Sequence, residues 1–280
     1  MIITDSPGWD PNGWSSTDSP GFVDPGCALT VTLGGLVFST GADRPQGSGF
    51  LLSLHRIVGW DESADDRTST WGHWSGDGDS AGRLRWGVRE VALEGMVLGT
   101  VGYGLGSPSE AHTAIMRKRS STLRVSEVNG LTLEADVRIK SLQMTRRRGW
   151  PKWADFTLSL VADDPLRYGS GERSLSNGTV SLPNRGDQMA WPVLESSGPH
   201  GELSITHPGG TWTVPALDAG LRRTYDFRHG RTYNTSGQRI WGSHTGSGPR
   251  PRVEAQGWTD WTISGKGSGS LTLRRFEAWS

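Results

Sequence analysis

The sequence predicts a mainly β fold of two domains, with one short helix in the first. The chain has 280 residues, more than one ordinary domain needs. It contains 40 Gly and 15 Pro, and only 34% of its residues are apolar. Turn residues this frequent, set between short apolar runs, indicate short strands joined by many turns rather than a helical bundle.

The first predicted domain spans residues 1–170 and opens with an extended arm, residues 1–27, rich in Pro, Gly, Asp and Ser. Five segments are expected to be strands: Leu29–Phe38, Phe50–Leu54, Trp86–Leu98, Leu131–Lys140 and Asp155–Ala162. Apolar and polar residues alternate in the last three. The strands Leu131–Lys140 and Asp155–Ala162 should pair across the loop "SLQMTRRRGWPKW". The polar, Gly-rich stretch Trp60–Gly82 is expected to be a long loop.

One segment has the signals of a helix start. In "SPSE", Ser107 can cap the helix, Pro108 suits its first position, and Glu110 completes a capping box. The basic triplet that begins at Arg117 would follow at the helix end, where the helix dipole favours cations.

The second predicted domain, residues 171–280, is expected to be a compact β-sandwich. The polar passage "SGERSLSNGTVSLPNRGDQ", which follows Gly169, is interpreted as the domain boundary. Its strands are expected at Trp191–Glu195, Glu202–His207, Thr211–Val214, Leu221–Phe227, Trp258–Ile263 and Leu271–Phe276. The last two are predicted to form a hairpin across a Gly/Ser turn.

The charge balance argues against a simple nucleic-acid or anionic-membrane binder, because 29 basic and 29 acidic residues cancel. The charges are unevenly distributed, however: residues 1–110 carry 6 basic and 14 acidic groups, net −8, whereas residues 111–160 carry 10 and 4, net +6. This asymmetry suits ordered self-assembly, although a solvated surface with uneven loops has the same pattern. Cys27 is the only cysteine, and the N-terminus has no signal-peptide pattern, so a soluble, unprocessed chain without disulfides is expected.

The sharpest enzyme-like motif is "GDSAG", which matches the nucleophile elbow around Ser80. An elbow needs a buried strand before the serine and a helix after it, whereas this sequence predicts a polar loop and then a strand. The same loop fails as a calcium site, because Ala81 and Val88 stand where ligands are required. No catalytic residue, metal or cofactor is therefore predicted.

Two adjacent carboxylates, Asp163 and Asp164, end the strand of "DFTLSLVADDPLRYG". Neighbouring residues of a strand point to opposite faces, so the pair cannot easily share a substrate or a proton. Pro165 keeps Asp164 extended, and Asp-Pro commonly ends a strand. The pair is interpreted as the end of a strand and not as an acid pair.

Two groups of residues are candidates for binding. The segment "RRRGWPKW" combines Arg146, Arg147 and Arg148 with Trp150, which is the composition of a single-stranded nucleic-acid groove but equally of a protein-docking loop, and docking is favoured. Trp212, Trp241, Trp258 and Trp261 could stack on sugars, although most should lie in the core. Trp241, in a polar and Gly-rich segment, is the best candidate for carbohydrate stacking.

Several motifs resemble the distal tail proteins of long-tailed, non-contractile bacteriophages. They are the early "LTVTLGGLVFSTG", the strand "VREVALEGMVLG", the segment "VADDPLRYG" and the downstream "NGTVSLPNRGDQMAWPVLESSG". The closing "LTLRRFEAWS" is similar to the ending of minor tail proteins from phages of actinobacteria. The resemblance spans nearly the whole chain but does not include Trp60–Gly82.

The resemblance implies a fold, an assembly and a set of partners. The fold would be an N-terminal ring-forming domain and a galectin-like β-sandwich, with Asp164, Pro165 and Tyr168 at their junction. The assembly would be a homohexameric ring at the distal end of the virion tail, with a lumen for passing DNA. Its partners would be the tail tube protein, a tail-tip hub or tail-associated protein, and the tape measure protein.

Two other functions stay open at this point. The chain could be a carbohydrate-binding module that contacts host cell-wall glycan, through Trp241. A hydrolase using Ser80 is the hypothesis with the poorest support.

Overall fold

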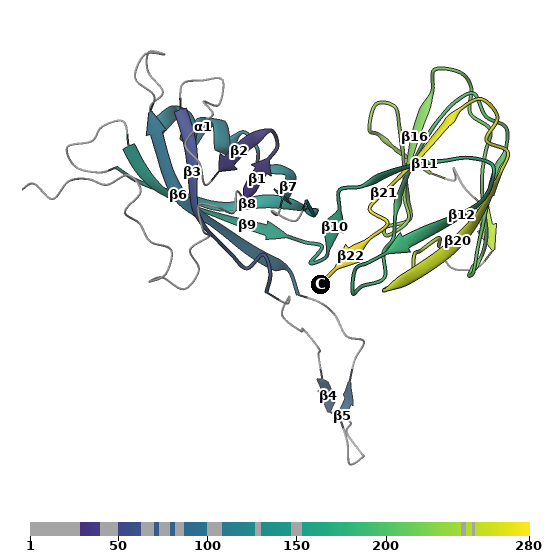
Figure 1. Ribbon diagram of the computed structural model, residues 1–280, viewed down its shortest axis with the longest axis horizontal. Coiled ribbons are helices and arrows are strands. Elements are labelled where there is room, and N and C mark those ends of the chain that lie inside the picture. Colours follow the sequence, from purple (N-terminus) through teal and green to yellow (C-terminus); the bar gives the residue numbers. More distant parts are fainter. Residues whose placement is uncertain are drawn as a thin grey trace, which may run out of the picture. The chain divides into compact units, whose positions relative to one another are not determined.

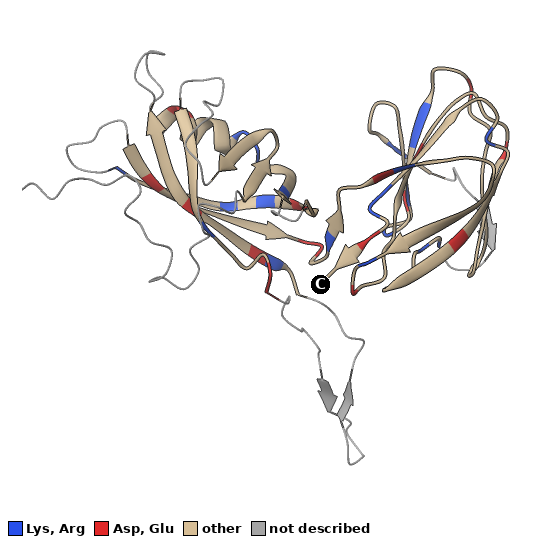
Figure 2. Cartoon of the chain, viewed as in Figure 1, with Lys and Arg blue, Asp and Glu red and all other residues tan. Residues whose placement is uncertain are grey.

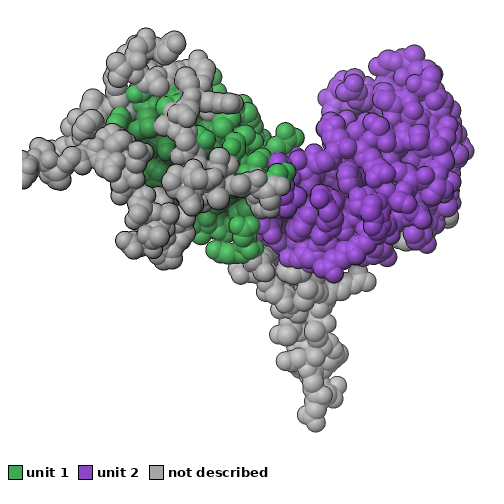
Figure 3. All heavy atoms as spheres, in the orientation of Figure 1, with its two compact units in different colours: residues 1–62, 90–130, 136–162 green, residues 63–89, 131–135, 163–280 purple. Residues whose placement is uncertain are grey.

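The computed structural model describes residues 29–39, 50–62, 87–99, 108–126, 130–146, 153–241 and 250–280, together with the backbone of 70–72, 79–81 and 245–247. The chain divides into two compact units (Figure 3). The first comprises residues 1–62, 90–130 and 136–162, and the second residues 63–89, 131–135 and 163–280. The fold is mainly β in both, as the sequence predicts.

The first unit is built on a closed seven-stranded barrel (Figure 1). Its strands, in sheet order, are β8 (Thr132–Arg146), β7 (Ser120–Ser126), β1 (Thr30–Leu33), β2 (Leu36–Ser39), β3 (Phe50–Val58), β6 (Arg89–Gly99) and β9 (Trp153–Ala162). Pairing of β8 with β9 closes the barrel. Closure removes the open edges at which a sheet could pair with another chain.

The alternation in the sequence places the barrel core. Along β6, Val91, Leu93 and Val97 are buried on one face, as predicted. The rings of Phe38 and Phe156 meet inside with centroids 5.8 Å apart. These contacts show that the period-two pattern was the correct guide to which faces are buried.

The single helix among the described residues, α1 (Pro108–Met116), begins at the predicted proline. It buries Ala111 and Ile115, four residues apart on one helix face. The proposed cap Ser107 lies outside the described residues. The helix ends one residue before the basic triplet, so Arg117 follows the last helical residue and does not belong to the last turn. No helix within the described ranges has the length and apolar character that crossing a membrane requires.

Two predicted boundaries in this unit were wrong. The segment Leu29–Phe38 is not one strand but the hairpin of β1 and β2, because Gly34 and Gly35 adopt φ of +53° and +89° and make a tight two-residue turn. β8 continues to Arg146 through residues assigned to a loop, and its pairing with β9 has an irregularity between Ile139 and Ser141. That irregularity shifts the alternation by one residue, so that Leu142 and Met144 lie on the less exposed face.

The second unit is a sandwich of two antiparallel sheets (Figure 1). One has the order β11 (Glu172–Leu175), β21 (Ser270–Arg274), β13 (Val193–Ser197), β16 (Arg222–Asp226), β17 (Arg231–Asn234) and β18 (Arg239–Ile240). The other has the order β12 (Gly178–Asn184), β20 (Gly257–Ser264), β14 (Leu203–His207), β15 (Gly210–Val214) and β19 (Thr245–Ser247). β4 (Thr70–Gly72) and β5 (Asp79–Ala81) pair with each other in a separate two-stranded antiparallel ribbon.

Two short strands complete the second unit. Tyr168 and Gly169 of β10 (Arg167–Gly169) pair with Glu134 and Leu133, and β10 pairs on its other side with β22 (Ala278–Trp279). These two strands could not be predicted from the sequence, because two or three residues are too few to show alternation.

Aromatic side chains from both sheets fill the sandwich core. The Trp212 ring meets Tyr225 and Phe227 edge-on, at centroid distances of 5.1 and 4.8 Å, and Trp261 lies 6.0 Å from Phe227. Edge-to-face packing is favourable for such rings. Trp212 and Trp261 are therefore core residues.

Two expectations for the sandwich were wrong. β20 and β21 do not form a hairpin, because they lie in different sheets and the segment between them crosses from one sheet to the other. The passage interpreted as a turn-rich boundary contains β11 and β12, and Leu175 and Leu182 bury their side chains in the core. A sheet can accept many polar residues on its exposed face, so polarity alone did not exclude strands.

Asn184 is a buried side chain that joins three backbone segments. Its amide nitrogen donates to the carbonyls of Gln188 and Val253, at 2.8 and 3.4 Å, while its amide oxygen accepts from the N–H groups of Gly186 and Ala278, at 3.0 and 3.2 Å. Since only 1% of its surface is exposed, water cannot replace these bonds.

Replacing Asn184 with Leu should lower the free energy of unfolding by about 2–4 kcal/mol, because backbone groups would lose their partners inside the protein. Urea unfolding measures the loss. The matched control is Asn177→Ala, since exposed Asn177 accepts one hydrogen bond, from the Lys266 N–H. Its loss should stay below about 1 kcal/mol. Equal losses would show that burial of the amide does not matter.

Candidate functional site

Asp164 anchors a polar network at the start of β10. Its Oδ1 accepts from the backbone N–H of Leu166 at 3.1 Å and forms an ion pair with Nη2 of Arg228 at 2.7 Å. Its Oδ2 accepts from the Tyr168 hydroxyl at 2.7 Å. Nη1 of Arg228 donates to that hydroxyl oxygen at 2.6 Å, which closes the triangle of side chains.

Burial dominates the ionisation of Tyr168, whose surface is only 3% exposed. Desolvation raises the pKa of the Tyr168 phenol well above its ordinary value of 10.0, and the neighbouring Asp164 carboxylate raises it further. Arg275 lies over the same ring, with its guanidinium carbon 5.4 Å from the centroid, and also contacts Glu134 at 3.2 Å. The phenol therefore stays protonated and remains a hydrogen-bond donor to Asp164.

The two adjacent carboxylates have different surroundings. Asp163 is exposed, whereas the side chain of Asp164 is only 21% exposed. Pro165 is buried, and its carbonyl accepts a 2.8 Å hydrogen bond from Nε of Arg89, itself 2% exposed. This geometry gives Asp164 a structural task in the chain.

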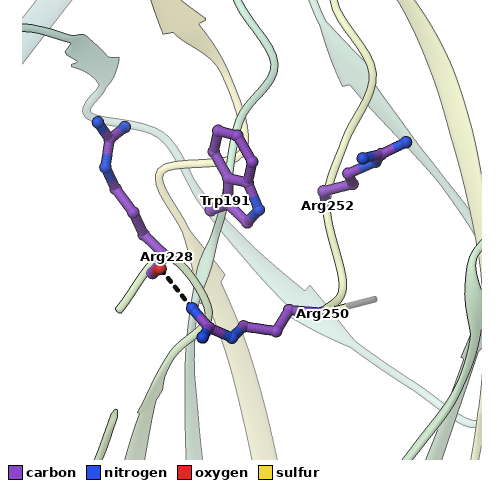
Figure 4. A pocket seen from close by; sticks show the side chains of 4 residues that line it. All are labelled: Trp191, Arg228, Arg250 and Arg252. Carbon is purple, nitrogen blue, oxygen red and sulfur yellow. Dashed lines mark hydrogen bonds between the residues drawn. The ribbon is translucent and has the colours of Figure 1, made fainter. Parts of the chain in front are cut away.

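Arg228 also lines an open pocket of about 400 Å³ together with Trp191, Arg250 and Arg252. In Figure 4 the Trp191 indole stands between Arg228 and Arg252, with Arg250 beneath it. The guanidinium carbon of Arg228 lies 5.8 Å from the centre of the indole. The pocket therefore combines one flat aromatic face with three cations.

Backbone contacts hold the three segments of this pocket together. Ala190 and Val253 exchange two hydrogen bonds of 2.9 Å in an isolated antiparallel bridge, so the next residues along, Trp191 and Arg252, lie opposite each other. The N–H of Phe227 donates to the carbonyl of Pro192 at 3.4 Å. The lining residues thus come from a framework that does not depend on a ligand.

Arg250 is fixed by the turn after β16. Its Nη1 donates to the carbonyls of Arg228 and Phe227, at 2.6 and 3.4 Å. Gly230, with φ of +61°, makes room for it, since a Cβ there would lie 2.8 Å from the guanidinium carbon. The turn thereby orients the guanidinium of Arg250 through Nη1, and these bonds do not use its Nε or Nη2 groups.

The predicted docking loop is only partly within the described residues. Arg146 ends β8, is exposed and donates to the Ser109 hydroxyl of α1 at 2.8 Å. Arg147, Arg148 and Trp150 lie outside the described part of the chain. The docking role of this loop stays a prediction.

The predicted carbohydrate-stacking residue, Trp241, is 75% exposed. The guanidinium carbon of Arg239 lies 3.7 Å from the centre of its ring, so one face of the indole is already covered. Trp258, another of the four tryptophans considered for sugar stacking, is 71% exposed. Sugar stacking by Trp241 stays a prediction that would have to use the opposite face of the indole.

The structure places Ser80 in the middle of β5, opposite Trp71 of β4, and not at a turn between a strand and a helix. Within the described residues, no three His, Cys, Asp or Glu side chains come close enough together to hold a metal ion. The excess of basic residues in 111–160 is partly compensated inside the first unit, because Lys140 of this segment pairs with Glu90 at 2.8 Å. In Figure 2 both signs of charge occur on neighbouring strands of this barrel.

The mainly β fold of this chain is similar to that of two solved phage proteins. The chain is similar to the crystal structure of the Dit protein (gp 19.1) of phage SPP1, with a TM-score of 0.54 and 14% identity, over 90% of this chain and 99% of that one. It is also similar to a chain of the phage P2 baseplate in its activated conformation with calcium, with a TM-score of 0.51 and 8% identity, over 89% and 98% of the two chains. No protein-family model and no curated protein matches the sequence.

Replacing Asp164 with Asn should lower the free energy of unfolding by about 1–3 kcal/mol, since it removes the charge that Arg228 pairs with in a partly buried site. The matched change Asp163→Asn, at the exposed neighbour, should cost less than about 0.5 kcal/mol. Chemical denaturation of the two variants compares them directly. Equal, severe losses would contradict the division of roles between the two carboxylates.

Replacing Tyr168 with Phe should flatten the alkaline loss of stability. In the unfolded chain this phenol loses its proton near pH 10, whereas the folded protein keeps it, so its stabilisation is complete below that pH and is lost as the pH rises further. The wild type should lose up to about 1.4 kcal/mol more per pH unit than the variant. Urea titrations between about pH 9 and pH 11 test this. Parallel pH profiles would show that Tyr168 ionises normally.

Proposed function

We propose that this protein is a structural component of a bacteriophage tail, forming a hexameric ring between the tail tube and the tail tip. The observation that carries the proposal is the likeness to the SPP1 Dit structure, which extends over both units and over 99% of that chain. Its published description places that protein in a hub adsorption apparatus of phages that infect Gram-positive bacteria. Fold similarity at 14% identity supplies the architecture, and the role is inferred from it.

The two units take different parts in this proposal. Residues 1–170 would form the ring and residues 171–280 a galectin-like sandwich on it, with Asp164, Pro165 and Tyr168 where one passes into the other. The closed barrel supports this division, because a barrel without open edges is a rigid block that assembles through its surface and not by strand exchange. Partners would be further copies of the chain, the tail tube protein, the tail-tip hub and the tape measure protein.

A ring requires heterologous contacts, in which one surface of a copy binds a different surface of the next. The net charges of −8 for residues 1–110 and +6 for residues 111–160 are suited to such a contact. The exposed Arg117 and Arg119, next to the end of α1, are candidates on the basic side. The proposed role is structural and non-enzymatic, with the lumen giving passage to DNA without reading its sequence.

Light scattering with negative-stain microscopy of the purified protein should show six copies in a ring. Changing both Arg117 and Arg119 to Glu should dissociate the ring, because like charges would then face each other. The matched control is Arg222→Glu, an exposed arginine of the sandwich that should leave the ring intact. A strict monomer at tens of micromolar would overturn the proposal.

A further inference from the structure

The chemistry of its lining limits what the pocket around Trp191 can bind. The lining side chains are three guanidinium groups and one indole, all of which donate hydrogen bonds and none of which accepts them. A ligand that fits must therefore be rich in acceptors. It must also offer a flat apolar face if it is to use the indole.

The three cations are not equally available. Arg228 uses Nη1 and Nη2 on Tyr168 and Asp164, so its charge is compensated and its terminal nitrogens are occupied. Arg252 is paired through Nε with Glu254 at 2.9 Å, but that pair is 41% and 50% exposed and is correspondingly weak. The hydrogen bond to Glu254 is made by Nε and not by the two terminal nitrogens of Arg252.

Arg250 is the cation of the pocket whose charge is not neutralised. Among the described residues it has no carboxylate partner, and its hydrogen bonds go through Nη1 to two backbone carbonyls. Those bonds fix the guanidinium without consuming its Nε or Nη2 donors. A guanidinium held in place in this way loses little side-chain entropy when it binds an anion.

The size of the site limits the ligand. A volume of about 400 Å³ with one indole suits a single ring bearing an anion. A single-stranded nucleic acid needs a basic groove with several stacked aromatics, whereas residues 163–280 carry 13 basic and 11 acidic groups, net +2. An acidic peptide would bring backbone N–H donors for which the lining offers no acceptor.

We infer that the sandwich unit carries a binding site for an anionic sugar, in which Arg250 and Arg252 hold a carboxylate or phosphate and Trp191 stacks on the sugar ring. Arg228 is a positioning residue, held by Asp164 beside the indole. The site is distinct from Trp241 and does not depend on the hexameric ring. The same chemistry would accept a uronic acid or a sugar phosphate.

Ligand-observed NMR titration of the full chain tests this with three probes that share one ring: glucose, glucuronate and glucose 6-phosphate. Glucuronate or glucose 6-phosphate should bind at least about tenfold more tightly than glucose, and added salt should weaken the binding. The tighter of the two identifies the carboxylate or the phosphate as the natural group. Equal binding of all three, or no binding, would overturn the inference.

The variants locate the site. Arg250→Gln and Arg252→Gln should each weaken binding about tenfold, and Trp191→Ala should abolish the NMR contacts to the sugar ring. Arg222→Gln, an exposed arginine at the other end of β16, and Trp241→Ala should leave binding unchanged. Unchanged binding in the pocket variants, or its loss in Trp241→Ala, would place the ligand elsewhere and overturn the assignment.

Glu254→Gln distinguishes a ligand site from a merely structural cluster. Removing this half-exposed carboxylate frees Arg252, so glucuronate and glucose 6-phosphate should bind about threefold more tightly. A loss of affinity would contradict the site. An oligo(dT) strand or a hexaglutamate peptide that binds more tightly than either sugar, with the same dependence on Arg250, would replace the sugar by another class of ligand and overturn the inference.

Discussion

The ion pair between Asp164 and Arg228 is the interaction on which both the start of the second unit and its pocket depend. Asp164 is fixed in sequence by the proline that follows it, and its carboxylate orders the next residues through the Leu166 N–H and the Tyr168 hydroxyl. Through Arg228 it also orients the turn after β16. The carbonyl of Arg228 then accepts the bond that fixes Arg250. One carboxylate thus organises two cations of the pocket, one directly and one through the backbone.

Much of the fold could be predicted because its information is local. Alternation along β6 and β9 identified both the strands and their buried faces, and the hairpin of β14 and β15 follows from Pro208-Gly209-Gly210 between two apolar runs. The wrong hairpin of β20 and β21 has a non-local cause. Whether β20 pairs with β21 or joins the opposite sheet depends on contacts between distant segments, and no short window of sequence records that choice.

The polar sites were even harder to predict from the sequence, because their side-chain contacts also join distant segments. The Asp-Pro step identified a strand end, but the partner of Asp164 is 64 residues away, in a turn with no motif of its own. Alternation along β8 puts Glu134 on the polar face of the strand, yet it is 7% exposed and contacts Arg275. The pocket combines residues 191, 228, 250 and 252, none of which was singled out. An arginine in a sequence gives no sign of whether its charge will be neutralised after folding.

Arg228 and Arg252 pair with carboxylates, whereas Arg250 has no such partner among the described residues. The fold alone does not explain this uncompensated charge. Barrel and sandwich architecture follows from apolar alternation, which many sequences at 14% identity or less can share. An uncompensated guanidinium beside a half-buried indole is not required by that architecture. Three cations gathered in one pocket repel one another, and among the described residues Asp164 and Glu254 offset two of them. A cluster with that intrinsic cost is more simply explained by an anionic ligand than by the stability of the sandwich.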